Sequence, residues 1–473
     1  MSRSLVMKFG GTSVADAAAI ANLVALVARA TDAHGVPPVV VVSAMSGATD
    51  TLLSLASSAE RRQDFRPHVD ALWQRHTDAL RALVPVSDGD EIERELAAHI
   101  NDLRALLDSA AILRAASPAA RDAIAATGEL MNSRIVAAAL QAAGVAATWV
   151  DARTVIVTDG HHGGAAPRPV ETQRAVELVL PPLMQLGQVP VVGGFVGATP
   201  DGVTTTLGRG GSDFSAAIIG AALPAAEIQI WTDVDGMLTA DPRIVSNARV
   251  VPSLSFGEAS ELAYFGAKVL HPSTILPAVA QGIPVRILNT RRPGSAGTLI
   301  VERPPADSRM LAAVACKRHV TTIEITSTRM LMAYGFLRRV FEIFERCRTS
   351  VDVVTTSEVS VSVTVDDDAR VQEIVGALRE IADVRVEPDM AILSAVGDNL
   401  RADTRIAARV IGALAGFDVR MVSQAASRRN VTIVVRDGDA VPAMVCLHEE
   451  FFGHEGHPHR AGPNGAAGGV ALS

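Results

Sequence analysis

Short runs of the buried-strand type alternate with helical segments through the first 300 residues of this 473-residue chain. The runs lack polar alternation, as in the Val-rich segment 39–43, which indicates strands that are covered on both faces. The repeated order of strand and helix therefore predicts an α/β domain with a parallel-rich sheet. Further strands are expected at 5–9, 147–150, 190–196 and 228–232.

Between about 51 and 143 the pattern is helical throughout, with apolar residues three and four positions apart. This segment predicts a helical lobe inserted into the α/β domain. Asp88-Gly89-Asp90 is expected to form a turn within it.

Length and composition narrow the class of protein further. The chain is too long for one hydrophobic core, so two or three domains are expected. The net charge of -8 argues against a nucleic-acid-binding surface. No apolar run reaches the roughly 18–20 residues that span a bilayer. Three widely spaced cysteines predict neither a disulfide framework nor a zinc site, and we expect a cytoplasmic protein without membrane contact.

A domain boundary is expected between residues 290 and 310, where Arg, Pro and Gly are concentrated. Beyond it the strand and helix signals occur in one order twice, and Ser357 and Ser427, like Val365 and Val435, are 70 residues apart. Such a duplication predicts tandem βαββ-type modules at 301–390 and 391–452, after a domain at 1–300. The first set of elements is expected at 321–325, 334–347, 351–354 and 359–365, and the second at 391–396, 403–415, 418–423 and 430–435.

The segment 453–473 is rich in Gly, Ala, Pro and His and shows no periodicity, which predicts a disordered tail. Its histidines are not expected to hold a metal ion, because a mobile segment does not keep a coordination geometry.

The sequence Met-Lys-Phe-Gly-Gly-Thr-Ser-Val at residues 7–14 places Lys8 within the first predicted strand, directly before two glycines. Glycines let backbone N–H groups approach an anion, and an Ala-rich helix is expected at 15–30. The segment is not a P-loop, because the lysine precedes the glycines. An ordinary strand-to-helix turn with a solvent-directed lysine is the alternative that these residues leave open.

Four segments together resemble the aspartate kinases of the amino-acid kinase family. They are Lys-Phe-Gly-Gly-Thr-Ser-Val at 8–14, Thr-Thr-Thr-Leu-Gly-Arg-Gly-Gly-Ser-Asp at 204–213, Trp-Thr-Asp-Val-Asp-Gly at 231–236 and Phe-Gly-Ala-Lys-Val-Leu-His-Pro at 265–272. The resemblance extends from residue 7 to about residue 452 and is greatest to the single-function, lysine-regulated enzymes. It implies an amino-acid kinase fold followed by two ACT modules that sense an amino acid.

The implied reaction is transfer of the γ-phosphate of ATP, with Mg, to the side chain of L-aspartate, the first step toward lysine, threonine and methionine. The aspartate carboxylate is already ionised near neutral pH, so no general base is needed. The resemblance assigns catalysis to Lys8 and Asp213. Taken alone, Asp213 is more typical of the cap of a helix at 214–223 than of a catalytic residue.

The resemblance also implies roles for substrate-binding residues. Arg209 is expected to bind the aspartate α-carboxylate and Glu129 the ammonium, with Ser43, Thr49 and Phe195 nearby. Without the resemblance, Glu129 would be an exposed charge in the first turn of a helix at 129–140. Leu238 replaces the tyrosine that relatives carry near the adenine. The expected nucleotide-binding residues are Lys8, Gly10, Gly11, Thr12, Ser13, Thr232, Asp233, Leu238, Arg243 and Lys268.

The second half resembles the lysine-binding segments of lysine-sensitive aspartate kinases. Inhibition by lysine across a homodimer of ACT modules is the expectation, with threonine as another effector and a tetramer as another assembly. A glutamate kinase and a non-catalytic amino-acid sensor are the alternative functions. The residues expected at the effector site are Met330, Gly335, Phe336, Leu337, Ser350, Val351, Asp352, Ser357 and Glu358.

Overall fold

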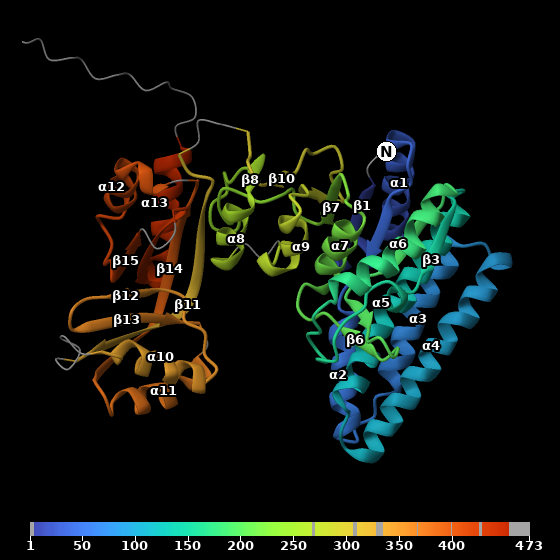
Figure 1. Cartoon of the computed structure of the whole chain (residues 1–473), viewed down its shortest axis with the longest axis horizontal. Helices are drawn as coiled ribbons and strands as arrows, with labels where there is room; N and C mark the ends of the chain where they lie inside the picture. The colour runs from blue at the N-terminus through green and yellow to red at the C-terminus, as the bar shows by residue number, and fades with distance from the viewer. Residues whose placement is uncertain are drawn as a thin grey trace, which may run out of the picture. The chain divides into compact units, whose positions relative to one another are not determined.

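The computed structural model describes residues 4–266, 270–305, 310–327, 334–366, 368–398, 400–424 and 428–453. The chain forms two compact units (Figure 1). The first consists of residues 1–241, 247–315 and 396–398, and the second of 242–246, 316–395 and 399–473. Among the described residues, no helix is both long and apolar enough to cross a membrane.

An eight-stranded sheet forms the centre of the first unit, in the order β3-β4-β2-β1-β7-β9-β10-β8. All neighbouring strands with a described register are parallel except β9 and β10, which confirms the predicted parallel-rich sheet. The strands are β1 (Leu5–Phe9), β2 (Val39–Val42), β3 (Ala147–Val150), β4 (Val189–Gly193), β7 (Glu227–Thr232), β8 (Ser253–Ser255), β9 (Val285–Asn289) and β10 (Thr298–Val301).

Helices cover both faces of this sheet. Leu5, Met7 and Phe9 of β1 join a core formed with α1 (Ala17–His34) and the helical lobe. Helices α6 (Pro169–Gln185) and α7 (Gly211–Ala222) contact β4 and β1 but contribute nothing to that core, so they cover the opposite face. Side chains alternate along a strand, so Lys8 points to the α7 side. The remaining helices of the unit outside the lobe are α8 (Phe256–Tyr264) and α9 (Leu276–Ala280).

The helical lobe consists of α2 (Ala48–Glu60), α3 (Arg66–Leu83), α4 (Val86–Leu113) and α5 (Pro118–Ala142). The turn expected at Asp88-Gly89-Asp90 is wrong, because these residues form the first turn of α4. The chain turns earlier, at Val84–Pro85, and the Gly89 N–H donates to the Pro85 carbonyl, 2.9 Å away.

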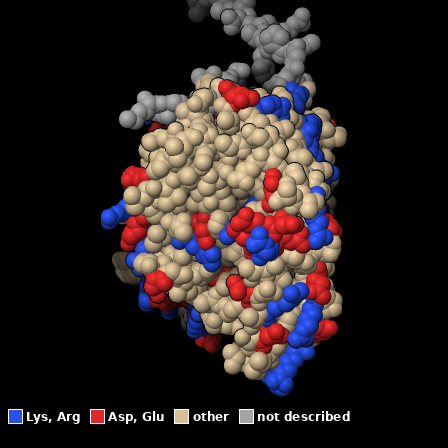
Figure 2. Space-filling view, turned by 90° about the vertical axis from the view of Figure 1, so that its right-hand side faces the viewer, with Lys and Arg blue, Asp and Glu red and all other residues tan. Residues whose placement is uncertain are grey.

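On the face of the molecule that Figure 2 shows, acidic and basic side chains lie next to one another.

The strand expected at 190–196 is two strands. β4 ends at Gly193, Phe195 adopts a positive φ of 64°, and β5 (Val196–Ala198) pairs antiparallel with β6 (Thr204–Thr206). A non-glycine residue with positive φ ends a strand, because it reverses the local course of the backbone. This break directs Phe195 into the pocket described below.

In the second unit, a six-stranded sheet has the order β12-β13-β11-β14-β16-β15. The strands are β11 (Ala313–Thr326), β12 (Val354–Thr356), β13 (Ser360–Val365), β14 (Asp383–Val396), β15 (Met421–Gln424) and β16 (Asn430–Arg436). The helices are α10 (Phe336–Arg346), α11 (Val371–Leu378), α12 (Thr404–Ala413) and α13 (Ala440–Phe452).

The predicted duplication is visible in this element order, because strand, helix, strand, strand and helix follow one another twice. Two expected strands are much too short: 321–325 and 391–396 are only the ends of β11 and β14, which have 14 residues each. The strands expected at 351–354 and 418–423 begin too early. Residues 351–353 precede β12, and residues 418–420 precede β15. The predicted tail and Ser427 lie outside the described residues.

We predict that Gly297→Ala strongly destabilises the first unit. Gly297 has a φ of +65°, and a Cβ atom there would lie 2.0 Å from the carbonyl oxygen of Ile287. Gly282→Ala is the matched control, because its φ is +63° but nothing lies within 4 Å. The free energy of unfolding of the control should fall by only about 1–2 kcal/mol, which is the cost of a left-handed backbone conformation for a residue with a Cβ atom. Thermal unfolding measures both, and equal losses would contradict the close approach at Gly297.

Candidate active site

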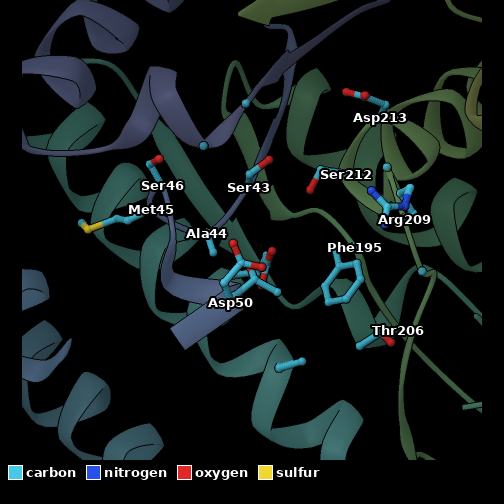
Figure 3. A pocket seen from close by; sticks show the side chains of 18 of the residues that line it. Ser43, Ala44, Met45, Ser46, Asp50, Phe195, Thr206, Arg209, Ser212 and Asp213 are labelled. Carbon is cyan, nitrogen blue, oxygen red and sulfur yellow. The ribbon is translucent and has the colours of Figure 1, made fainter. Parts of the chain in front are cut away.

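A pocket of about 830 Å³ opens at the carboxyl ends of β1, β2 and β7 and reaches α5 and α7. This edge of a parallel sheet is where ligands of open α/β folds bind. Figure 3 shows Arg209 and Asp213 on one side of the pocket and Ser43 to Ser46 on the other. Twelve predicted residues line it: Lys8, Gly10, Gly11, Thr12, Ser43, Thr49, Glu129, Phe195, Arg209, Asp213, Thr232 and Asp233.

Lys8 and Asp213 form an ion pair inside the pocket, with Nζ and Oδ1 2.6 Å apart. Their side chains are 9% and 13% exposed. Lys8 lies near the end of β1, a central strand, and Asp213 in the first turn of α7. An ion pair this far removed from water is sensitive to the loss of either partner, because the remaining charge would stay buried.

Two helical N-termini without side-chain caps face the same pocket. α7 begins after Gly210, and η1 (Gly11–Val14) is a short 3-10 turn that begins after Gly10. The first N–H groups of a helix have no intrahelical acceptor, so they can bind an anion. The helix expected at 15–30 starts two residues later, as α1, and Asp16 caps it by accepting a hydrogen bond from Ala19. The glycines therefore lead into η1 and not directly into the long helix.

Arg209 is exposed at the pocket wall, between Gly208 and Gly210. Within the described ranges, its guanidinium has neither an ion-pair nor a hydrogen-bond partner. Its five N–H donors are thus available to a carboxylate or phosphate ligand.

Glu129 is buried in the middle of α5, so its reading as an exposed charge in a first helical turn is wrong. The helix begins at Pro118, after the cap Ser117, well before the expected start. Burial raises the pKa of Glu129 to about 8, although hydrogen bonds from the Ala44 N–H and the Thr49 side chain lower it. Its Oε2 has no hydrogen-bond partner. A ligand ammonium would satisfy both the charge and this oxygen.

Asp122 is a pocket residue that the sequence interpretation missed. It accepts hydrogen bonds from the Thr206 hydroxyl at 2.7 Å and the Gly163 N–H at 3.0 Å, and its Oδ2 lies 2.7 Å from Nδ1 of His162. These contacts join α5, β6 and the loop before α6. Asp122 lies seven residues before Glu129, so the two side chains lie on the same face of the helix, two turns apart. This spacing could have identified Asp122 as a pocket residue from the sequence. Other missed lining residues include Met45, Ser46, Asp50, Arg121, Thr206 and Ser212.

Three predicted nucleotide-binding residues do not line this pocket. Ser13 is buried, and its hydroxyl lies 2.9 Å from the Thr290 hydroxyl, which is a contact within the fold. Leu238 forms an isolated bridge with Val250. Arg243 belongs to the second unit. Lys268 lies outside the described residues.

The predicted effector residues belong to the second unit. Phe336 is buried at the start of α10, in a core cluster against which Val351 packs, and Leu337 is half-exposed. Gly335 precedes α10 with a φ of 80° and offers no capping side chain. Asp352 has a side chain only 2% exposed. Ser350, Ser357 and Glu358 are exposed, and Met330 lies outside the described residues.

Comparison with known proteins identifies the family. The amino acid kinase family profile matches residues 3–289, and an ACT domain profile matches residues 393–451. The lysine-sensitive aspartokinase 3 of Escherichia coli strain K12 is 37% identical over 464 residues, covering 96% of this chain and 100% of that protein. This chain belongs to the aspartokinase family. As an aspartokinase it is a kinase, and the predicted family is confirmed.

Solved aspartokinases share the fold of this one. The crystal structure of E. coli aspartokinase III with aspartate and ADP, called the R-state, has a TM-score of 0.81 at 35% identity and covers 95% of this chain and 100% of that chain. The T-state structure with lysine and aspartate has a TM-score of 0.80 at 36% identity, covering 95% and 99%. The predicted fold class, an amino-acid kinase fold with ACT structure, is therefore confirmed.

We predict that Glu129 makes stability depend on pH. Its pKa in the folded protein, about 8, lies above the ordinary 4.5, so the folded state keeps a proton that the unfolded state releases between these values. Stability from this group is complete below about pH 4.5 and is lost as pH rises through about 8. The thermal midpoint of the parent should fall relative to that of Glu129→Gln over this range. A constant difference would contradict the burial of an uncharged Glu129.

Proposed function

We propose that this chain transfers the γ-phosphoryl group of ATP to the side-chain carboxylate of L-aspartate. An O–P bond forms between that carboxylate and the γ-phosphorus, the bond from phosphorus to the β,γ-bridging oxygen breaks, and the products are 4-phospho-L-aspartate and ADP. The observation that carries this proposal is the buried Lys8–Asp213 pair beside two uncapped helical N-termini. A site with these charges can neutralise the negative charge on the transferring group.

Aspartate would be held at three points. Arg209, free of partners among the described residues, is suited to the α-carboxylate, and Glu129 to the α-ammonium. The side-chain carboxylate would then face Lys8. Binding of the ammonium favours the ionised form of Glu129, so aspartate binding near pH 7 should release a proton.

ATP would place its phosphates between Lys8 and the N–H groups at Gly11 and Thr12, with Thr232 and Asp233 on the same side of the pocket. Among the described residues, no cluster of three or more His, Cys, Asp and Glu side chains could hold a metal ion. Mg²⁺ would therefore arrive with the nucleotide and keep most of its ligands from phosphate and water, which is usual for this ion. Asp213 and Asp233 are the carboxylates that line the pocket on this side.

The second unit would bind lysine as a feedback inhibitor. The uncapped N-terminus of α10, at Gly335 and Phe336, offers N–H donors to an α-carboxylate, and Asp352 offers a carboxylate to an ammonium. Phe336, at the start of α10, and Val351, next to Asp352, pack in the same core cluster. Inhibition follows if lysine binds the inactive state more tightly than the active one.

Trapping the acyl phosphate with hydroxylamine tests the reaction. Hydroxamate should form from L-aspartate with ATP and Mg²⁺ but not from L-glutamate, since one added methylene displaces the carboxylate from Lys8. Turnover with glutamate would favour a glutamate kinase, and binding of aspartate without any turnover would favour a sensor. Added lysine should lower the rate, and threonine is the comparison effector.

We predict that Lys8→Ala lowers kcat by about 10²–10³-fold or more, the usual loss for one charge-stabilising group. Thr12→Ala is a matched control in the same pocket wall, because it removes a side chain but keeps the backbone N–H group that the proposal uses. The control should retain most of its turnover. A folded Lys8→Ala enzyme with parental kcat would contradict the role of Lys8.

A further inference from the structure

Lys317 of β11 bridges two aspartates of the second unit. Its Nζ lies 2.8 Å from Oδ1 of Asp352 and 2.7 Å from Oδ2 of Asp366. Asp352 precedes β12 and Asp366 follows β13. The sequence motif that indicates effector binding contains Asp352 but not Lys317, which lies 35 residues earlier.

The two aspartates differ in their surroundings. The Asp352 side chain is 2% exposed, whereas that of Asp366 is 45% exposed. A buried carboxylate needs a counter-charge, while an exposed ion pair contributes little to stability. Burial lowers the pKa of Lys317, but hydrogen bonds to both aspartates outweigh this, and the net pKa is raised. Lys317 is therefore a charged ammonium at neutral pH.

This geometry restricts access to Asp352. Its main chain is fixed, because the Asp352 N–H donates to the Thr364 carbonyl at 2.9 Å. Lys317 occupies Oδ1 of Asp352 at 2.8 Å and Oδ2 is buried, so a ligand ammonium that pairs with Oδ1 has to displace Lys317. Asp366 remains as a partner for the Lys317 ammonium when that ammonium leaves Asp352.

We propose that Lys317 is a latch on the effector site. In the ligand-free protein its ammonium occupies the position at Asp352 that an ammonium of the effector takes, and on binding it pairs with Asp366 alone. This inference rests on the proposed effector site and adds the residue that competes for it. Effector affinity is then set by an internal competition for one carboxylate.

Two substitutions should act in opposite directions. Lys317→Met removes the competing ammonium and leaves Asp352 without this counter-charge, so the Kd for L-lysine should fall, by about tenfold if one charge pair is worth about 1.4 kcal/mol. Asp366→Asn removes the alternative partner and keeps Lys317 on Asp352, so the Kd should rise several-fold. A purely structural ion pair predicts weaker binding for both variants.

Calorimetric titration of L-lysine into the full-length protein measures these values, and thermal unfolding checks the fold. Arg405→Met is the matched control, because it removes a positive charge from an exposed pair with Asp403 in the same unit. Its Kd should equal that of the parent. If Lys317→Met does not fold, Lys317→Gln takes its place, because it removes the charge but keeps a polar group beside Asp352, and it should also lower the Kd.

Each outcome has one meaning. A lower Kd for Lys317→Met together with a higher Kd for Asp366→Asn supports the latch, and the reverse pair of shifts contradicts it. Shifts in the same direction, or no shift, while the parent binds lysine, contradict the latch and leave the effector site standing. Lysine binding by Lys317→Met but not by the parent supports a latch that is closed in the parent. If lysine binds neither parent nor variants, the proposed effector site and the latch are both wrong.

Discussion

The ion pair between Lys8 and Asp213 is the interaction on which the proposed active site depends. It connects a central strand of the sheet to the first turn of the helix that covers one face. Removal of either partner would leave the other charge buried and uncompensated, so the fold holds the two proposed catalytic charges together. The pocket forms at this point because parallel strands end together there, and the loops that follow them provide its walls.

Helix α5 forms the opposite wall of the pocket with two buried carboxyl groups that differ in function. Asp122 is satisfied by the fold, since it accepts hydrogen bonds from β6 and the loop before α6. Glu129 keeps an oxygen without a partner, and its pKa is raised by burial. Glu129 and Arg209 are therefore both available to pair with the charged groups of a ligand. The second unit shows the reverse arrangement, in which Lys317 already supplies the countercharge to Asp352.

Much of this structure was predictable from the sequence, because continuous Val-rich runs and helical periodicity depend on local composition. The four family segments also contain eight of the twelve predicted residues that line the pocket. The errors have physical causes. The end of β4 depends on the positive φ of Phe195, which no composition signals, and the length of β11 depends on its partners in the sheet. Asp122 was missed because its role lies in contacts to segments 40 and more residues away.

A structure of this protein with L-aspartate and ADP would show whether the pocket holds aspartate in the orientation that the proposed reaction requires. We expect the α-carboxylate on Arg209, the ammonium on Glu129 and the side-chain carboxylate directed toward Lys8. An aspartate bound in reverse, with its side chain on Arg209, or bound outside this pocket, would contradict it. In either case the reacting carboxylate would lie away from the Lys8–Asp213 pair, and this pair could not act in phosphoryl transfer.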